Sequence, residues 1–199
     1  MLKIGITGNI GSGKTTVCKL FELLGIPVFY ADFHAKKVMT EDAALAAAIH
    51  SNFGDEAYFA NGSLNRKYIS TIVFNNETEL KKLNALVHPA VFRAFDQWAE
   101  QYQQHFYVLK EAALLFESGS NQQCDQTIVV AAALDARVKR VVQRDQLTEE
   151  EVLRREKKQI PQEEKEAKAN FIIHNDAQNM VVPQVLQIHQ QLLALAQKA

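Results

Sequence analysis

Short apolar runs alternate with longer stretches of helical periodicity along this chain of 199 residues. Each run is rich in β-branched or aromatic residues, and together they cover residues 2–7, 27–31, 107–112, 127–132 and 171–173. Continuous apolar runs of this length are typical of strands buried on both faces. Helical spacing at residues 15–24 and 181–198 adds flanking helices, and the last of these is expected to pack on the sheet. The alternation predicts an α/β fold: a five-stranded parallel sheet flanked by helices.

The interval between the second and third predicted strands is much longer than one crossover connection needs. Residues 42–53 look helical, and residues 76–104 hold one or two helices, with a break expected near Pro89. We therefore predict a single domain over residues 1–199. Its core covers about 1–33, 105–145 and 170–199, and an inserted helical substrate lobe covers about 34–104.

Charged residues dominate residues 148–169, where apolar positions are sparse. This pattern predicts a helical hairpin, which is either a solvated surface element or a mobile lid over bound phosphates. We assign residues 146–169 to this helical lid.

The charge balance gives no general attraction to nucleic acid or to an anionic membrane, because 22 lysines and arginines face 23 aspartates and glutamates. Cys18 and Cys124 lie far apart, without the spacing of a disulfide framework or a zinc site, which fits a reducing cytoplasm. The six histidines show no metal-ligand spacing either. The first sixteen residues contain no apolar stretch of the length that a signal peptide or membrane span requires.

Residues 8–15 (GNIGSGKT) match the phosphate-binding pattern G-x-x-x-x-G-K-[ST] in full, between a predicted strand and a predicted helix. Glycines allow the backbone N–H groups to converge on an anion, and the following helix adds the positive end of its dipole. The pattern therefore predicts ATP binding. We expect Lys14 to reach the β- and γ-phosphates and the Thr15 hydroxyl to bind Mg²⁺.

Phosphoryl transfer also needs an acceptor hydroxyl held in line and a base near it. Asp32 follows the second predicted strand, and ligands of α/β sheets collect at the carboxyl ends of strands. We predict Asp32 as the general base. The alternative is that Asp32 caps the helix starting near Phe33.

Arg137, Arg140 and Arg144 recur at helical spacing after the fourth predicted strand and could grip phosphates. The alternative for them is a solvated basic face that pairs with acidic residues 149–151. Glu111, at the end of the third strand, could orient Mg²⁺ through water or pair with Lys110.

The chain resembles the dephospho-CoA kinases along nearly its whole length. The segments that carry the resemblance are TGNIGSGKTT (7–16), LGIPVFYAD (24–32), LNALVHP (83–89), LLFE (114–117), RVVQRD (140–145), RREKKQ (154–159) and FIIHN (171–175). It departs from the family pattern at Tyr30, Ala113, Asn170 and His174.

The resemblance implies a P-loop NTPase-type fold with a helical lobe for the CoA substrate and a lid. It implies ATP-dependent phosphorylation of the ribose 3′-hydroxyl of dephospho-CoA, the last step of coenzyme A biosynthesis. By resemblance Asp32 is the base on that hydroxyl, Arg140 contacts phosphates from the lid side, and His88 and Leu115 bind the substrate. The residues assigned to ATP are Gly11, Ser12, Gly13, Lys14, Thr15, Thr16, Arg144 and Asn175, with Asn175 near the adenine.

Two other functions remain open from the sequence. Another small-molecule P-loop kinase, such as a nucleoside or nucleotide kinase, would keep the same loop and an acceptor-side carboxylate. A nucleotide-dependent switch would need no base such as Asp32. The sequence does not fix the oligomeric state, for which a monomer is plausible.

Overall fold

The computed structural model describes residues 1–74 and 76–198. The chain divides into two compact units, each described by itself below. The first joins Met1–Tyr30 to the chain from Ala99 onward, and the second is Ala31–Trp98.

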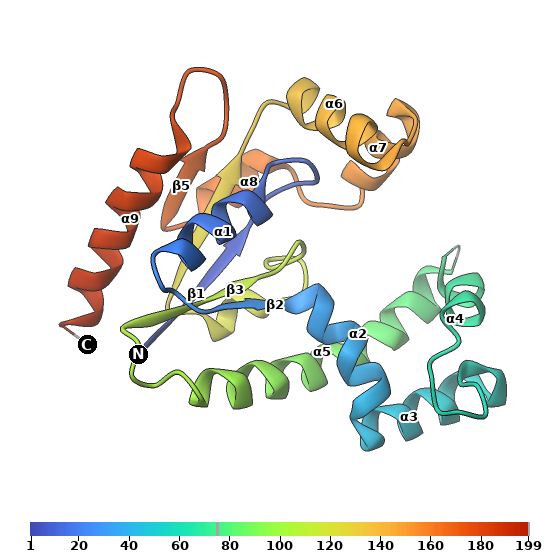
Figure 1. Ribbon diagram of the computed structural model, residues 1–199. Helices are drawn as coiled ribbons and strands as arrows, with labels where there is room; N and C mark the ends of the chain where they lie inside the picture. Colours follow the sequence, from blue (N-terminus) through green and yellow to red (C-terminus); the bar gives the residue numbers. More distant parts are fainter. Residues whose placement is uncertain (75, 199) are drawn as a thin grey trace. The chain divides into compact units, whose positions relative to one another are not determined.

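The first unit is built on a five-stranded sheet in the order β2-β3-β1-β4-β5, with all four strand pairs parallel (Figure 1). The strands are β1 (Leu2–Thr7), β2 (Val28–Tyr30), β3 (Tyr107–Glu111), β4 (Gln126–Ala131) and β5 (Phe171–His174). The sequence-predicted strands are thus confirmed to within about one residue at each end, as expected for runs that are buried on both faces.

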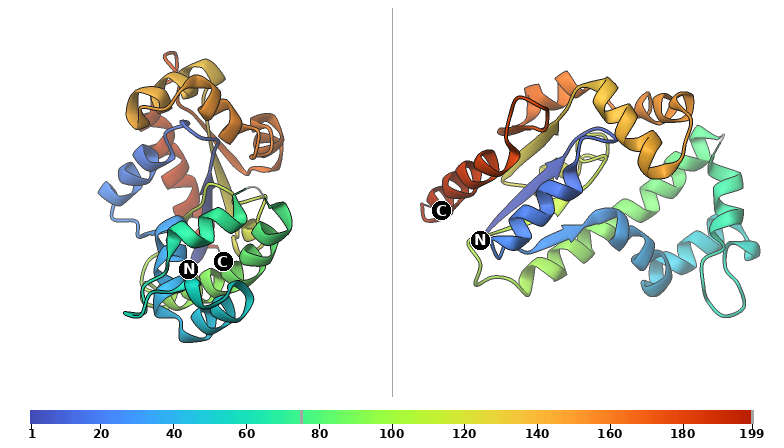
Figure 2. Two further views of the ribbon diagram at one scale, coloured as in Figure 1. Left: turned by 90° about the vertical axis from the view of Figure 1, so that its right-hand side faces the viewer. Right: turned by 45° about the horizontal axis from the view of Figure 1, so that its top comes forward.

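Helices α1 (Lys14–Leu23) and α9 (Val181–Ala196) pack against each other and against the sheet, and Figure 2 shows them side by side. Their apolar faces join alternate residues of the strands in one core. Its buried members include Ile4, Ile6, Val17, Phe21, Leu109, Ile128, Ile173, Val185, Ile188 and Leu192. The predicted packing of the last helix on the sheet is therefore confirmed.

Three helices follow β4: α6 (Leu134–Asp145), α7 (Glu149–Glu156) and α8 (Gln162–Lys168). Helix α7 begins with a capping box, in which the Thr148 hydroxyl accepts from the Glu151 amide and the Glu151 carboxylate accepts from the Thr148 amide. The segment predicted to form a helical hairpin does contain two helices, but they pack on different elements and not mainly on each other. Helix α7 packs on α6, whereas α8 packs against β4 with the Lys165 side chain fully buried.

Helices make up most of the second unit: α2 (Ala31–Glu41), α3 (Ala43–Phe53), the short 3₁₀ turn η1 (Asp55–Ala57), α4 (Arg66–Val73) and most of α5 (Glu77–Glu100). Asp42 joins several of these elements. Its carboxylate caps α3 by accepting from the Leu45 amide at 3.0 Å, and it accepts from Arg93 of α5 at 3.0 Å.

The break expected near Pro89 is wrong, because α5 runs through this proline without interruption over 24 residues. Proline lacks the amide that would bond to the carbonyl four residues earlier, Ala85, and this usually ends or kinks a helix. Here apolar side chains on both sides of the proline, including Val87, Ala90 and Val91, are buried. Burial on both sides favours a continuous helix over the local preference of one residue.

Candidate active site

The loop between β1 and α1 is held in a conformation that requires glycine. Gly11 and Gly13 have φ angles of +78° and +95°, in the left-handed region that side chains disfavour. A Cβ on Gly11 would collide with the backbone carbonyl of Arg137, and one on Gly13 would collide with the Asn175 side chain. The pattern G-x-x-x-x-G-K-T is therefore a consequence of tight packing as well as of anion binding.

Lys14 opens helix α1, and its ammonium donates to the Gly8 carbonyl at 2.8 Å, across the loop. Gly13 occupies the N-cap position without a side-chain capping bond, which keeps that helix terminus available to an anion. Thr15 and Thr16, in the first turn, are exposed. Among the described residues, the Ser12 hydroxyl is buried without a hydrogen-bond partner. An orphaned donor inside the loop fits a phosphate-binding cradle.

Two predicted residues far along the chain lie against this loop. Asn175, directly after β5, donates from its side chain to the Ser12 carbonyl at 2.7 Å. Arg140 of α6 donates to the Asn175 carbonyl at 3.0 Å and to the Gly11 carbonyl at 3.4 Å. Arg140 is exposed, so its guanidinium lies at the rim of the loop, where it can also reach a ligand.

The three arginines of α6 have different environments. Arg137 is buried, 2.7 Å from the Glu156 carboxylate, and also donates to the Ala132 and Ile10 carbonyls. Arg137 therefore forms a buried structural ion pair with Glu156, and the hypothesis that Arg137 binds phosphate is not supported. Arg144 is exposed and forms a two-pronged bond with Asp145, its sequence neighbour, which lowers the pKa of that carboxyl.

Glu111 lies at the end of β3, opposite Ile6 of β1, and is largely buried. The pKa of the Cys18 thiol in α1 is raised by its burial and, secondly, by the negative charge of Glu111. Glu111 is therefore close to α1. Lys110 points to the opposite face of the sheet, since neighbours on a strand alternate, and its ammonium donates to Gln123 at 2.8 Å.

Sequence reasoning missed one group of residues, at the exit of α7. Glu156 accepts from the Asn9 side chain at 2.8 Å, and the side-chain oxygen of Gln159 accepts from the Ile10 amide at 2.8 Å. These contacts join positions about 150 residues apart, which no local pattern reveals. Their only sequence trace was the segment RREKKQ, which contains both residues.

Leu115, predicted by resemblance to bind substrate, has a fully buried side chain that packs over Gly5 of β1. Its position is that of a core residue in this structure.

Asp32 and His88 belong to the second unit. Asp32 is exposed in the first turn of α2, which begins at Ala31, so it is inside the helix and not at the N-cap position. The His88 ring stacks on Phe92 one turn further along α5, with ring centroids 6.3 Å apart.

Over residues 1–74 and 76–198, no helix is long and apolar enough to cross a membrane. In the same residues no group of three or more histidine, cysteine or acidic side chains is placed to hold a metal ion.

A parallel sheet with this loop between its central strand and the first helix defines the P-loop class of nucleotide-binding proteins, and the chain is a P-loop kinase by fold. The family model described as dephospho-CoA kinase matches residues 2–180. The chain belongs to the dephospho-CoA kinase family.

Relatives of similar length agree with this assignment. The dephospho-CoA kinase of Salinibacter ruber is 41% identical over 178 residues, covering 88% of this chain and 89% of the relative. That of Bacteroides fragilis is 36% identical over 187 residues, covering 94% and 91%. The solved structure of the dephospho-CoA kinase from Campylobacter jejuni has a TM-score of 0.71 and 28% identity, covering 96% of this chain and 97% of that one.

Proposed function

We propose that this protein transfers the γ-phosphoryl group of ATP to the ribose 3′-hydroxyl of dephospho-CoA, giving CoA and ADP. Family membership supports the reaction. The observation that carries the proposal for this chain's own residues is the β1–α1 loop, with Arg140 and Asn175 bonded to its carbonyls.

The ATP phosphates would lie in the loop Gly11–Gly13, bound by its amides and by the N-terminus of α1. Lys14 would neutralise the β- and γ-phosphates, and Arg140 would meet the transferring group from the rim. Asn175 would fix the loop from the side where we expect the adenine, with Arg144 as a further contact and Thr16 in the first turn.

Mg²⁺ fits the exposed Thr15 hydroxyl, since this ion commonly keeps several waters and takes its remaining ligands from one or two protein oxygens and the phosphates. When bound, Mg²⁺ neutralises charge on the transferring phosphates. Glu111, buried at the neighbouring strand end, is the carboxylate we propose to orient its waters.

On the acceptor side, Asp32 would accept the proton of the ribose 3′-hydroxyl, and His88 would bind dephospho-CoA. The lobe Ala31–Trp98 is the part of the chain we assign to this substrate. Leu115 stays a proposed substrate-binding residue by resemblance alone, since its side chain is fully buried.

The lid that excludes water during transfer is α7 in this proposal. Water exclusion matters because an open site would hydrolyse ATP without an acceptor. We place the reaction in the cytoplasm, where the free thiols Cys18 and Cys124 remain reduced.

The test is ATP consumption with Mg²⁺, with and without dephospho-CoA, together with assignment of a new 3′-phosphate in the product. Acceptor-dependent formation of CoA is expected. Turnover with a nucleoside or nucleotide but not with dephospho-CoA would replace this proposal by another P-loop kinase activity.

Asp32→Asn tests the general base, because the amide keeps the shape of the side chain but cannot accept the proton. We expect kcat to fall by roughly 10² to 10⁴, with little change in the Kd for ATP. Asp42→Asn is the matched control in the same unit, since Asp42 caps α3 and the proposed mechanism does not use it. Near-normal turnover by Asp32→Asn would remove Asp32 from the mechanism.

A further inference from the structure

The segment between α7 and α8 holds the phosphate-binding loop through side chains to which no catalytic role has been assigned. Gln159 lies in this segment and uses both ends of its carboxamide. The oxygen accepts from the Ile10 amide at 2.8 Å, and the nitrogen donates to the Ala113 carbonyl at 3.2 Å. One side chain therefore joins the phosphate-binding loop to the loop after β3.

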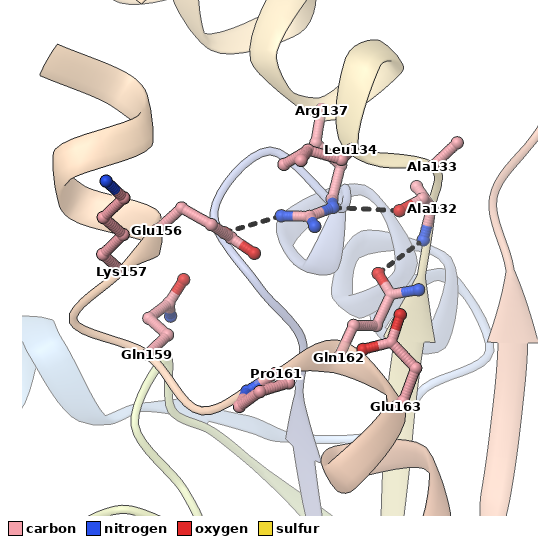
Figure 3. Close-up of a pocket in the computed structure, with 10 residues that line it drawn as sticks. All are labelled: Ala132, Ala133, Leu134, Arg137, Glu156, Lys157, Gln159, Pro161, Gln162 and Glu163. Carbon is pink, nitrogen blue, oxygen red and sulfur yellow. Dashed lines mark hydrogen bonds and ion pairs between the residues drawn. The ribbon is translucent and has the colours of Figure 1, made fainter. Parts of the chain in front are cut away.

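Neighbouring bonds support the same connection. The Asn9 side chain donates to the Glu156 carboxylate at 2.8 Å and to the Ile160 carbonyl at 3.2 Å. The other Glu156 oxygen pairs with the buried Arg137, as Figure 3 shows. Consecutive loop residues Asn9 and Ile10 are thus both bonded to the exit of α7.

The segment itself is anchored to the core. The Ile160 amide donates to Glu117 at 3.1 Å, and the fully buried Lys165 ammonium of α8 lies 2.9 Å from the same carboxylate. The Gln159 side chain is anchored in this way and accepts a hydrogen bond from the Ile10 amide of the phosphate-binding loop. Such a bond fixes the direction of the peptide groups on either side of that amide.

From this geometry we infer that Gln159 is a positioning residue for ATP: it sets the conformation of the loop through Ile10, without touching the nucleotide. The inference rests on the proposed function, in which this loop binds ATP. Loss of the two bonds leaves the Ile10 amide without its side-chain partner, so the loop can move away from the shape that receives phosphate. The Ala113 carbonyl keeps the Thr7 hydroxyl and the Lys165 ammonium, each at 3.4 Å.

The test compares Gln159→Met with Gln162→Met. Methionine keeps the length of the side chain and removes its hydrogen bonds. Gln162 is a matched control because it too is partly buried and accepts from a backbone amide, that of Ala132 at 3.1 Å, which lies at the end of β4 and not in the loop (Figure 3).

We expect Gln159→Met to raise the KM and the Kd for ATP about tenfold, the size of effect that unpaired backbone groups produce. The KM for dephospho-CoA should stay within about twofold, and Gln162→Met should leave both KM values near wild type. If the role of Gln159 is only structural, Tm should instead fall in both variants, and the KM for ATP should not change more than the KM for dephospho-CoA. Gln159→Asn, which keeps the amide but is one methylene shorter, replaces the methionine variant if that variant does not fold.

An unchanged KM for ATP in Gln159→Met, or an equal rise in Gln162→Met, would overturn the inference. Calorimetric titration with ATP alone separates the inference from the proposed function. If the wild-type protein binds ATP but does not phosphorylate dephospho-CoA, the proposed reaction is contradicted. The Kd for ATP of the Gln159 variant would still test the inference. Wild-type protein that binds no ATP would overturn both.

Discussion

At the scale of single residues, two glycines with nearly the same φ angle distinguish the cost of a left-handed backbone from the cost of a collision with neighbouring atoms. Gly11 and Gly25 have φ angles of +78° and +79°. A Cβ on Gly11 would meet the Arg137 carbonyl, whereas a Cβ on Gly25 would meet no described atom within 4 Å. The two positions therefore share the same φ within about one degree and differ in their neighbours.

We expect Gly25→Ala to cost roughly 1–2 kcal/mol of unfolding free energy, from left-handed strain alone, with ATP binding unchanged. Gly11→Ala adds a backbone collision, so the loop must shift and ATP binding should be lost. Denaturant unfolding and ATP titration of both variants check this. Equal ATP affinity in the two variants would show that the loop tolerates a side chain at Gly11.

The sequence pattern was enough to identify the residues of the phosphate-binding loop, but it did not reveal the different environments of the three arginines on α6. Arg137, Arg140 and Arg144 share one helical face, so periodicity gave them one role. Their differences come from partners: Glu156 for Arg137, loop carbonyls for Arg140, and Asp145 for Arg144. Two of these three partners are remote in sequence, which is why the pattern could not separate the arginines.

At the scale of elements, strands were predictable because burial on both faces makes them continuous apolar runs, and the five appear within about one residue of expectation. The ends of helices were less so. Helix α5 passes through Pro89 because burial before and after it outweighs one missing amide. The substrate lobe, predicted at about 34–104, corresponds to a compact unit at Ala31–Trp98 whose substrate role stays a prediction.

The cap of α3 gives a pH-dependent prediction at this scale. Hydrogen bonding by the Leu45 amide lowers the pKa of Asp42, with Arg93 adding to the shift. A carboxyl with a lowered folded-state pKa stabilises the fold above its unfolded value of about 3.9 and loses that contribution as the pH falls through the folded value.

Asp42→Ala should therefore reduce the unfolding free energy by about 1 kcal/mol near neutral pH, and by much less at about pH 3. Asp42→Asn keeps a capping oxygen without the charge, so its stability relative to wild type should rise towards acid pH. Urea unfolding of the three proteins at both pH values checks the sign. A gap between wild type and Asp42→Ala that widens in acid would contradict the assignment.

At the scale of the whole molecule, the question is which part of the predicted lid, 146–169, can move. Charge patterning treated the segment as one unit, because α7 and α8 are similarly polar. The two helices differ in how they pack on the rest of the unit. Helix α8 is tied to the core through Lys165 and through Gln162, which accepts from the Ala132 amide. Helix α7 has Val152 as its buried residue and rests on α6. Its last residue, Glu156, is bonded to Arg137 and Asn9, so the part of α7 before this residue is the part that can open.

Hydrogen exchange with and without ATP and Mg²⁺ tests this division. Local opening is easiest where few side chains are buried, so α7 amides before the anchored Glu156 should exchange readily in the free protein and slow when ligand closes the site. Amides of α8 should change no more than those of α9, which give the baseline for the general stabilisation that any ligand produces. If α8 slows together with α7, both helices move as the lid, and the anchoring of Lys165 to Glu117 must break when the site opens.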